Sequence, residues 1–267
     1  MDATTIIATT RDRYKLCHSY TDRGAASWHR SDGKFGRCSF ATYFVKPRRL
    51  RFDWRLTEES VQSVGADRVW CNGTEHCWRH SDGKTDEIGS FLSSVLGESG
   101  RSLGADIGLF AAMCTAAREC GGVCWKVPSI MVDEKISKGK DVLSMKEVEV
   151  LAEERVGERL CYVLRGTVFR TGDHIVWICQ ADFTIRRINE QSTVRGKDVA
   201  VIFEQMSEQK LRSRKFLEDA GVDLEKLSQQ ALQLEDAYHL NEFTYEDVAF
   251  DQEIAADIFS DADVEQA

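Results

Sequence analysis

The chain has 267 residues, of which 42% are hydrophobic, so it is long enough and apolar enough to bury a sizeable core. Its formal net charge of -9 at pH 7 argues against nucleic acid as the main partner, because phosphate binding needs a concentrated basic surface. No window approaches the roughly eighteen unbroken apolar residues that a membrane helix needs, which predicts a globular protein without a membrane span.

The first residues do not open a basic segment followed by an apolar run, so no secretory signal is predicted within this sequence. Two locations stay open: the cytosol, or the periplasm or cell envelope if a signal peptide was removed ahead of Met1. The nine cysteines do not decide between them. Because their number is odd, at least one thiol is free in a monomer.

Residues 4–17 predict a short amphipathic helix that follows threonines able to cap it. From Ser19 onwards, segments rich in β-branched and aromatic residues are separated by short turns. These segments predict strands at 19–30, 36–46, 49–57, 66–71 and 75–80. Turns this short cannot make a parallel crossover, so the strands are expected to form an antiparallel meander.

The alternation is clearest in residues 46–55, where Leu50, Phe52 and Trp54 are separated by charged residues. A period of two is typical of a strand with one face in water and the other against something apolar. The open question is whether that apolar face covers a solid core or a cavity.

Residues 86–118 lose the alternation and predict two short apolar helices. Strands are predicted again at 146–155, 159–170, 173–180, 182–194 and 237–250. Before the last strand, two amphipathic helices separated by Gly221 predict a helical insertion at about 197–236. The order indicates an α+β fold, a single domain over 1–267 in which a strongly curved antiparallel sheet holds helices in its concavity.

The common signatures of nucleotide binding, serine hydrolysis and zinc proteolysis are absent, which favours a protein that is not an enzyme and has no cofactor. Cys71, His76, Cys77 and His80 have the side chains of a zinc site. On a strand, however, Cys77 would point away from the two histidines, so a plain hairpin around Asn72 is favoured and no metal is predicted. A disulfide between Cys71 and Cys77 would require an oxidising compartment.

A thiol redox activity is the enzymatic alternative. It would use Cys120 and Cys124, which flank a Gly-Gly pair, and it requires an exposed, acidic thiol. Their spacing is not the two-residue spacing of thioredoxin-like motifs, so small buried cysteines in a tight turn are the favoured interpretation.

Aromatic residues recur on successive predicted strands, which fits an ordinary core and fits equally the lining of an apolar cavity. If a cavity is present, its sheet side is predicted to be Phe40, Phe44, Phe52, Trp54, Trp70 and Trp78. Its helical lid is predicted to be Phe91, Leu92, Val95, Leu109 and Phe110. An acyl chain or a similar apolar group is the ligand that such a cavity would hold.

Residues 40–54, an apolar strand followed by Lys46-Pro47 and an aromatic strand, resemble a segment of the LolA/LolB-like superfamily of outer-membrane lipoprotein carriers and acceptors. Later segments resemble that superfamily in the same order, from residue 14 to about residue 259. They are 68–73, 76–78, 162–166, 176–178, 183–188 and 243–250. Each motif is weak alone, and their order carries the resemblance.

The resemblance implies an unclosed antiparallel β-barrel capped by helices, with an apolar cavity that accepts lipid acyl chains. It implies a non-enzymatic cell-envelope protein that binds a lipid or a lipidated polypeptide. It also implies that Lys46 contacts the lid, although the carriers have an arginine there and lysine does not reproduce its fork geometry. The nine cysteines and the 197–236 insertion depart from the carriers, which indicates a divergent member.

The alternative function is a protein-interaction or sensor module on the same fold. In that case the half-barrel is solid, and the helical pair at 198–236 presents its surface to a protein partner.

Overall fold

The computed structural model describes residues 1–260 except 32, 60–65, 74–75, 81–84, 88–105, 138–140, 169–171, 195–228, 231 and 234–236. The strands are β1 (Ser19–Arg30), β2 (Phe35–Val45), β3 (Arg49–Glu59), β4 (Ala66–Asn72), β5 (His76–His80), β6 (Thr85–Glu87), β7 (Lys146–Val156), β8 (Arg159–Val168), β9 (Gly172–Cys179), β10 (Ile185–Val194) and β11 (Ala237–Phe250). The helices are α1 (Ala3–Leu16), α3 (Ile107–Glu119), α4 (Pro128–Met131) and α5 (Glu134–Ser137), with 3₁₀ turns η2 (Val123–Trp125), η3 (Val142–Ser144) and η4 (Ala256–Phe259).

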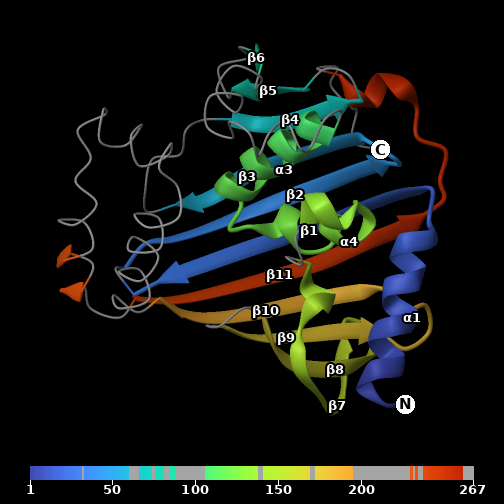
Figure 1. The fold of residues 1–267 in the computed structure, drawn as a ribbon, viewed down its shortest axis with the longest axis vertical. Coiled ribbons are helices and arrows are strands. Elements are labelled where there is room, and N and C mark those ends of the chain that lie inside the picture. Colours follow the sequence, from blue (N-terminus) through green and yellow to red (C-terminus); the bar gives the residue numbers. More distant parts are fainter. Residues whose placement is uncertain are drawn as a thin grey trace.

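All the strands belong to one antiparallel sheet with the order β6-β5-β4-β3-β2-β1-β11-β10-β9-β8-β7 (Figure 1). The first and last strands, β1 and β11, pair in the middle of the sheet, and a meander extends outwards on each side. Within the described residues the edge strands β6 and β7 do not pair with each other, so the sheet does not close into a barrel. The predicted curved antiparallel α+β fold is therefore confirmed.

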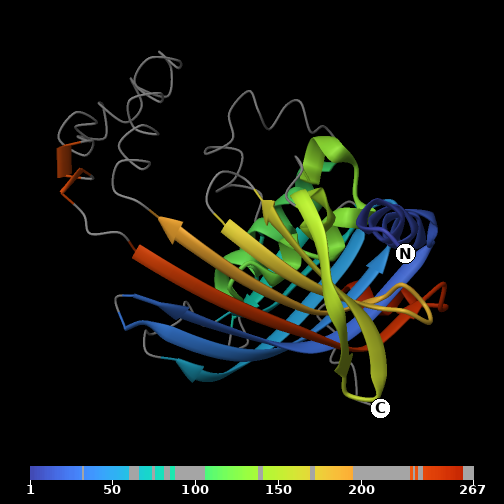
Figure 2. The ribbon, with the colours of Figure 1, turned by 90° about the horizontal axis from the view of Figure 1, so that it is seen from below.

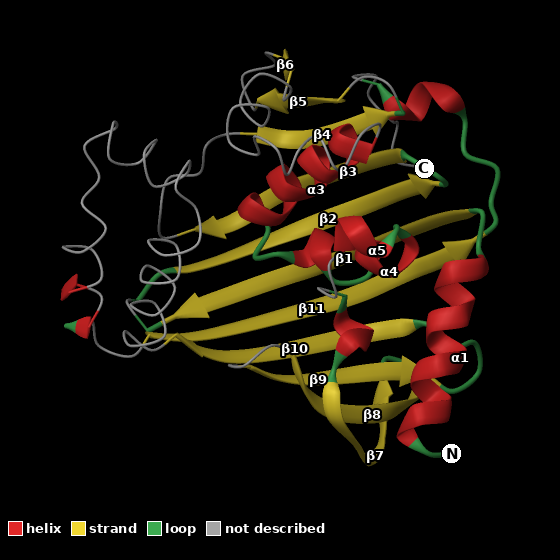
Figure 3. Cartoon of the chain, viewed as in Figure 1, coloured by secondary structure: helices red, strands yellow, loops and turns green. Residues whose placement is uncertain are grey.

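The sheet curves around its helices, as the view from below makes plain (Figure 2). Helices α1, α3 and α4 all lie on the concave side (Figure 3). The buried side chains of these helices and of the inner sheet face form one continuous hydrophobic cluster. A second, small cluster of Cys161, Val163, Trp177 and Cys179 lies separately on β8 and β9.

Predicted and observed elements agree closely for α1 and for the strands except β6, which was not predicted. The cap of α1 differs from the prediction, since the side chain of Asp2, not a threonine, accepts a hydrogen bond from the Thr5 backbone N–H at 2.9 Å. Helix α3 confirms the second of the two predicted apolar helices, and 88–105, where the first was expected, lies outside the described residues. The short helical turns between 123 and 144 were not predicted, because segments of three or four residues show no periodicity.

Cross-strand register sorts the inner-face side chains into rows across β3, β2, β1 and β11. One row is Leu50, Phe44, Tyr20 and Phe250, the next is Phe52, Thr42 and Asp22, and the third is Trp54, Phe40, Gly24 and Tyr245. Alternation along β3 therefore places its aromatic residues inside and its charged residues outside, as the sequence predicted.

The outer face of β3 carries a buried charged network. The Arg51 side chain is fully buried and makes bonds of 2.8–2.9 Å to the Asp53 carboxylate, which also accepts a bond from Arg68 at 2.9 Å. A further Arg51 nitrogen donates to the Ile258 carbonyl at 3.0 Å. The segment around η4 is thereby attached to the convex side of β3 and β4.

Gly24 is required by close packing in the middle of the sheet. A Cβ at this position would lie 2.0 Å from the Thr244 carbonyl oxygen and 2.6 Å from the Phe40 ring. We expect Gly24→Ala to lower the free energy of unfolding by about 1–3 kcal/mol, the usual cost of overpacking. Urea unfolding would measure this, with the exposed Ala25→Ser as the control. A Gly24→Ala protein as stable as wild type would contradict the prediction.

Candidate functional site

The concave side of β2 and β3 is an aromatic wall, which we define as Phe40, Phe44, Phe52 and Trp54. All four side chains are at most 5% exposed. The Phe40 and Phe52 rings stack with centroids 5.7 Å apart, and the Phe52 and Trp54 centroids are 5.8 Å apart. Alternation on neighbouring strands brings these rings to one face, where they form a continuous apolar surface.

Helix α3 covers this wall, lying over β3 and β4 (Figure 1). Its buried side chains include Leu109 and Phe110, which belong to the same cluster as the wall. The rest of its buried face consists of Met113 and the small side chains of Ala111, Ala112 and Ala116, all completely buried. The protein's own helix therefore occupies the concave side in this structure, so a ligand would gain access to the wall only when α3 moves away.

The wall carries one polar atom without a partner. Trp54 is 4% exposed, and its indole Nε1 is buried with no hydrogen-bond partner in the described structure. A buried donor left unpaired costs about 1–3 kcal/mol. Such a donor among apolar rings is suited to a single acceptor, such as a carbonyl oxygen.

Six of the predicted ligand-binding residues meet on the concave side: Phe40, Phe44, Phe52, Trp54, Leu109 and Phe110. Trp70 is a correction. It pairs with Arg51 and so lies on the outer face, because residues directly opposite each other in the sheet share a face. The β4 residues on the inner face are its neighbours Val69 and Cys71.

Other predicted positions lie outside the described residues or side chains. Trp78 pairs with Val69 in β5, but its side chain is not described. Phe91, Leu92 and Val95 fall in 88–105, and the helical pair at 198–236 falls almost entirely in 195–228 and 234–236. The single-domain organisation and the insertion stay predictions.

Lys46 contacts a helix, but that helix is α1. Its Nζ donates to the Lys15 carbonyl oxygen and, at 3.4 Å, to the Tyr14 carbonyl oxygen. A cation at the end of a helix satisfies carbonyl groups that have no partner within the helix. The contacts that the structure describes for the Lys46 ammonium group are with α1, and its contact with the apolar lid residues stays a prediction.

A buried polar group interrupts the aromatic wall, and the sequence analysis missed it. Asp22 and Thr42 lie opposite each other on β1 and β2, and Tyr245 projects from the neighbouring row on β11. We call these three residues the polar notch. Their side chains are 1–3% exposed, and Asp22 Oδ1, Thr42 Oγ1 and Tyr245 Oη make no hydrogen bond in the described structure. The available signal was a charged residue at an inward position of β1.

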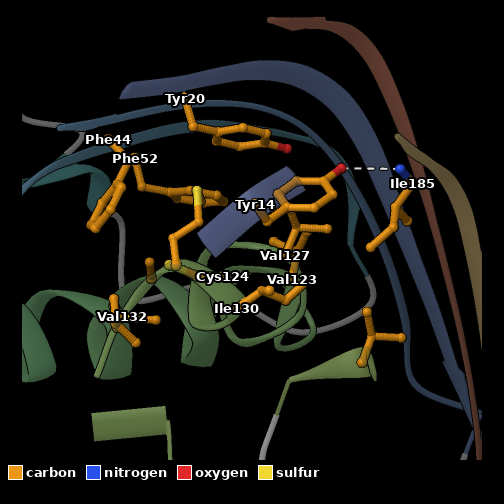
Figure 4. Packing of buried hydrophobic residues seen from close by; sticks show 14 of the residues in the cluster. Tyr14, Tyr20, Phe44, Phe52, Val123, Cys124, Val127, Ile130, Val132 and Ile185 are labelled. Atoms are coloured by element: carbon orange, nitrogen blue, oxygen red, sulfur yellow. Dashed lines mark hydrogen bonds between the residues drawn. The ribbon is translucent and has the colours of Figure 1, made fainter. Parts of the chain in front are cut away.

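Burial raises the pKa of Asp22 to about 6, although a hydrogen bond from Tyr20 and the nearby Thr42 oppose the rise. The Tyr20 hydroxyl donates to Asp22 Oδ2 at 2.5 Å. Burial, with the Asp22 charge as a smaller contribution, also raises the pKa of Tyr245 and of Cys124. Cys124 belongs to η2 and directs its sulfur towards the sheet (Figure 4).

An ion pair joins η2 to the sheet beside the notch. Lys126, which directly follows η2, pairs with Glu190 of β10, and both side chains are largely buried. The Asn241 side chain donates to Glu190 at 3.2 Å, and His174 Nδ1 lies 3.4 Å from it. Burial lowers the pKa of His174, so this histidine is neutral at pH 7 and Lys126 is the cation that pairs with Glu190.

The cysteines do not support the thiol alternative. Cys120 and Cys124 are completely buried, and burial raises the pKa of Cys124, whereas a reactive thiol is accessible and acidic. Cys71 is buried on the inner face of β4, and the Cys77 side chain is not described. No group of three potential metal ligands is found within the described part of the chain, and none of its helices is long and apolar enough to cross a membrane.

The fold and the site define a class of protein: an open antiparallel half-barrel with an aromatic concave face covered by helices. Comparison with solved structures finds similar chains, including proteins of the LolA superfamily. The chain is similar to a LolA superfamily protein from Nitrosomonas europaea (10% identity, 97% of this chain and 98% of the other, TM-score 0.31). It is also similar to LprF from Mycobacterium bovis (8%, 92% of each chain, TM-score 0.44) and to a DUF1329 family protein from Desulfovibrio piger (12%, 96% of each, TM-score 0.33).

No protein-family model and no curated protein matches the sequence. At these identities and TM-scores the likeness concerns the fold, and no activity is transferred from these proteins.

Proposed function

We propose that this protein is a non-enzymatic binding protein that takes an acyl chain, of a lipid or of a lipidated polypeptide, against the aromatic wall when α3 moves outwards. The observation that carries the proposal is the unpaired Trp54 indole N–H inside an otherwise apolar surface. The cost of leaving this N–H unpaired is compensated if a ligand supplies a hydrogen-bond acceptor. The ester or amide carbonyl at the head of an acyl chain is such an acceptor.

The cover over the wall fits this role. Helix α3 presents Leu109, Phe110, Met113 and alanine side chains, so exchanging it for an acyl chain replaces one apolar contact surface with another. The aromatic rings stay buried in both states, so the free energy difference between them is small enough for a ligand to change the populations.

The test is the native mass of the protein recovered from a lysate that contains membranes, compared with its denatured mass. We expect a discrete excess that is lost on denaturation and matches a lipid. Trp54→Asp should abolish the excess, because a carboxylate would enter the apolar surface. Trp54→Phe keeps a ring but removes the N–H, and should reduce the bound fraction. Arg55→Ala, on the exposed face of β3, is the control and should keep it.

Two results would overturn the proposal. One is an unchanged lipid content in folded Trp54→Asp protein. The other is a native mass equal to the bare chain together with no uptake of palmitate or monopalmitoylglycerol by the purified protein in equilibrium dialysis.

A further inference from the structure

The polar notch lies on the inner face of the sheet, where apolar side chains are expected. Its row, Phe52, Thr42 and Asp22, lies between two rows that are otherwise mainly aromatic. Asp22 is 2% exposed at the centre of an eleven-stranded sheet, under η2. Buried carboxylates are normally paired with a cation or fully hydrogen-bonded.

Asp22 has only part of that support. Tyr20 satisfies Oδ2, whereas Oδ1 makes no hydrogen bond of ordinary geometry and is supported only by Thr42 opposite it on β2. No lysine, arginine or histidine of the described residues acts on this carboxylate. Thr42 Oγ1 and Tyr245 Oη, on the neighbouring strands, are unpaired as well. Three polar atoms without a hydrogen bond of ordinary geometry thus come from three adjacent strands on the concave face, with Thr42 directly opposite Asp22 and Tyr245 within reach of the Asp22 charge.

We propose that the polar notch recognises the head group of the ligand, and that it takes an amphiphile whose head group donates hydrogen bonds and carries no negative charge. This inference rests on the proposed function and defines the ligand class for the same concave face. A hydroxyl or ammonium group donates to Asp22 Oδ1, and the Thr42 and Tyr245 hydroxyls each donate or accept as the head group requires. A carboxylate or phosphate head group would meet the Asp22 charge at low dielectric and be repelled.

Access to the notch requires η2 to move, because Cys124 of η2 is buried with its sulfur towards the sheet (Figure 4) and interacts electrostatically with Asp22. The Lys126–Glu190 ion pair attaches η2 to β10 beside the notch, while the backbone around Gly121 and Gly122, both at positive φ, joins η2 to α3. Lifting α3 and η2 together therefore uncovers the aromatic wall and the notch as one continuous surface.

The experiment measures three probes with the same chain length, monopalmitoylglycerol, hexadecylamine and palmitate, by equilibrium dialysis against the full chain at pH 7.5. We expect the first two to bind at least tenfold more tightly than palmitate. Asp22→Asn should remove this preference, weakening hexadecylamine about tenfold and strengthening palmitate. Glu246→Gln, at an exposed carboxylate of β11, is the matched control and should keep the preference.

Thr42→Val is a second variant, similar in shape to the wild type, that removes one hydroxyl and leaves the charge. It should weaken monopalmitoylglycerol severalfold and leave the discrimination against palmitate intact. Equal binding of all three probes by wild type, or an unchanged preference in Asp22→Asn, would overturn the inference while leaving the proposed function standing. Failure of all three probes to bind wild type, together with a native mass equal to the bare chain, would overturn both.

Discussion

Replacing Arg51 by alanine should destabilise the protein by about 1–3 kcal/mol, because it leaves buried hydrogen-bonding groups of the network without their partner. Arg51 is completely enclosed between β3 and the η4 segment, and it joins the Asp53 carboxylate to the Ile258 carbonyl. Without Arg51, the Ile258 carbonyl loses this donor. Of the two arginines that pair with Asp53, only Arg68 is then left. Urea unfolding followed by circular dichroism would measure the loss.

Arg51→Lys should fall between wild type and Arg51→Ala, because an ammonium group cannot hold a carboxylate and a carbonyl in the fixed geometry of a guanidinium. Arg55→Ala, on the same face of β3 but exposed, should change stability by less than about 0.5 kcal/mol. If Arg51→Ala unfolds within 1 kcal/mol of wild type, the network does not hold the η4 segment as described.

Asp22→Asn should stabilise the protein at neutral and alkaline pH, which is unusual for a substitution in a core. The folded-state pKa of Asp22, about 6, lies above the value of 3.8 for an ordinary aspartate. The unfolded state therefore ionises first, and stability is lost as pH rises through about 6. The raised pKa lowers the free energy of unfolding by about 3 kcal/mol at pH 8 and by less than about 1 kcal/mol at pH 4.

The groups that face Asp22 do not change the direction of this pH dependence of stability. Tyr20, Tyr245 and Cys124 all have pKa values raised by burial, so they are neutral between pH 4 and pH 8. The measurement is the free energy of unfolding of both proteins at pH 4, 6 and 8. An advantage of Asp22→Asn that does not grow with pH would show that Asp22 is not buried as a charge.

Asp182→Asn provides a control of opposite sign. Burial raises the pKa of Asp182, but hydrogen bonds from the Thr184 hydroxyl and backbone N–H outweigh it, so the net pKa is lowered. Its charge contributes stability above the unfolded pKa, and that contribution is lost as pH falls. Asp182→Asn should therefore be less stable than wild type at pH 8 and approach it at acid pH.

The Asp22 prediction also bears on function. A buried charge that lowers stability at neutral pH is retained only if it serves another purpose, and binding sites commonly contain such groups. The stability measurement and the probe preference are independent, so together they separate an incidental buried carboxylate from a recognition residue.

The sequence by itself determined the strands, helix α1 and which side of β3 is apolar. Leu50, Phe52 and Trp54 alternate with charged residues, and a period of two fixes the face of each side chain whatever the strand packs against. The same reasoning supported the wall residues Phe40 and Phe44. Its failure at Trp70 is instructive, because alternation tells which residues share a face within one strand but not the register between strands.

Only the tertiary structure decided what each face meets. The pairing of Trp70 with Arg51 depends on the register between β3 and β4, and the burial of Arg51 under η4 depends on segments about 200 residues apart in the chain. The polar notch likewise joins β1, β2 and β11, and the contact of Lys46 with α1 depends on where that helix docks. Local propensity and periodicity act over a few residues, whereas desolvation and unpaired hydrogen-bonding groups arise only when distant segments exclude water together.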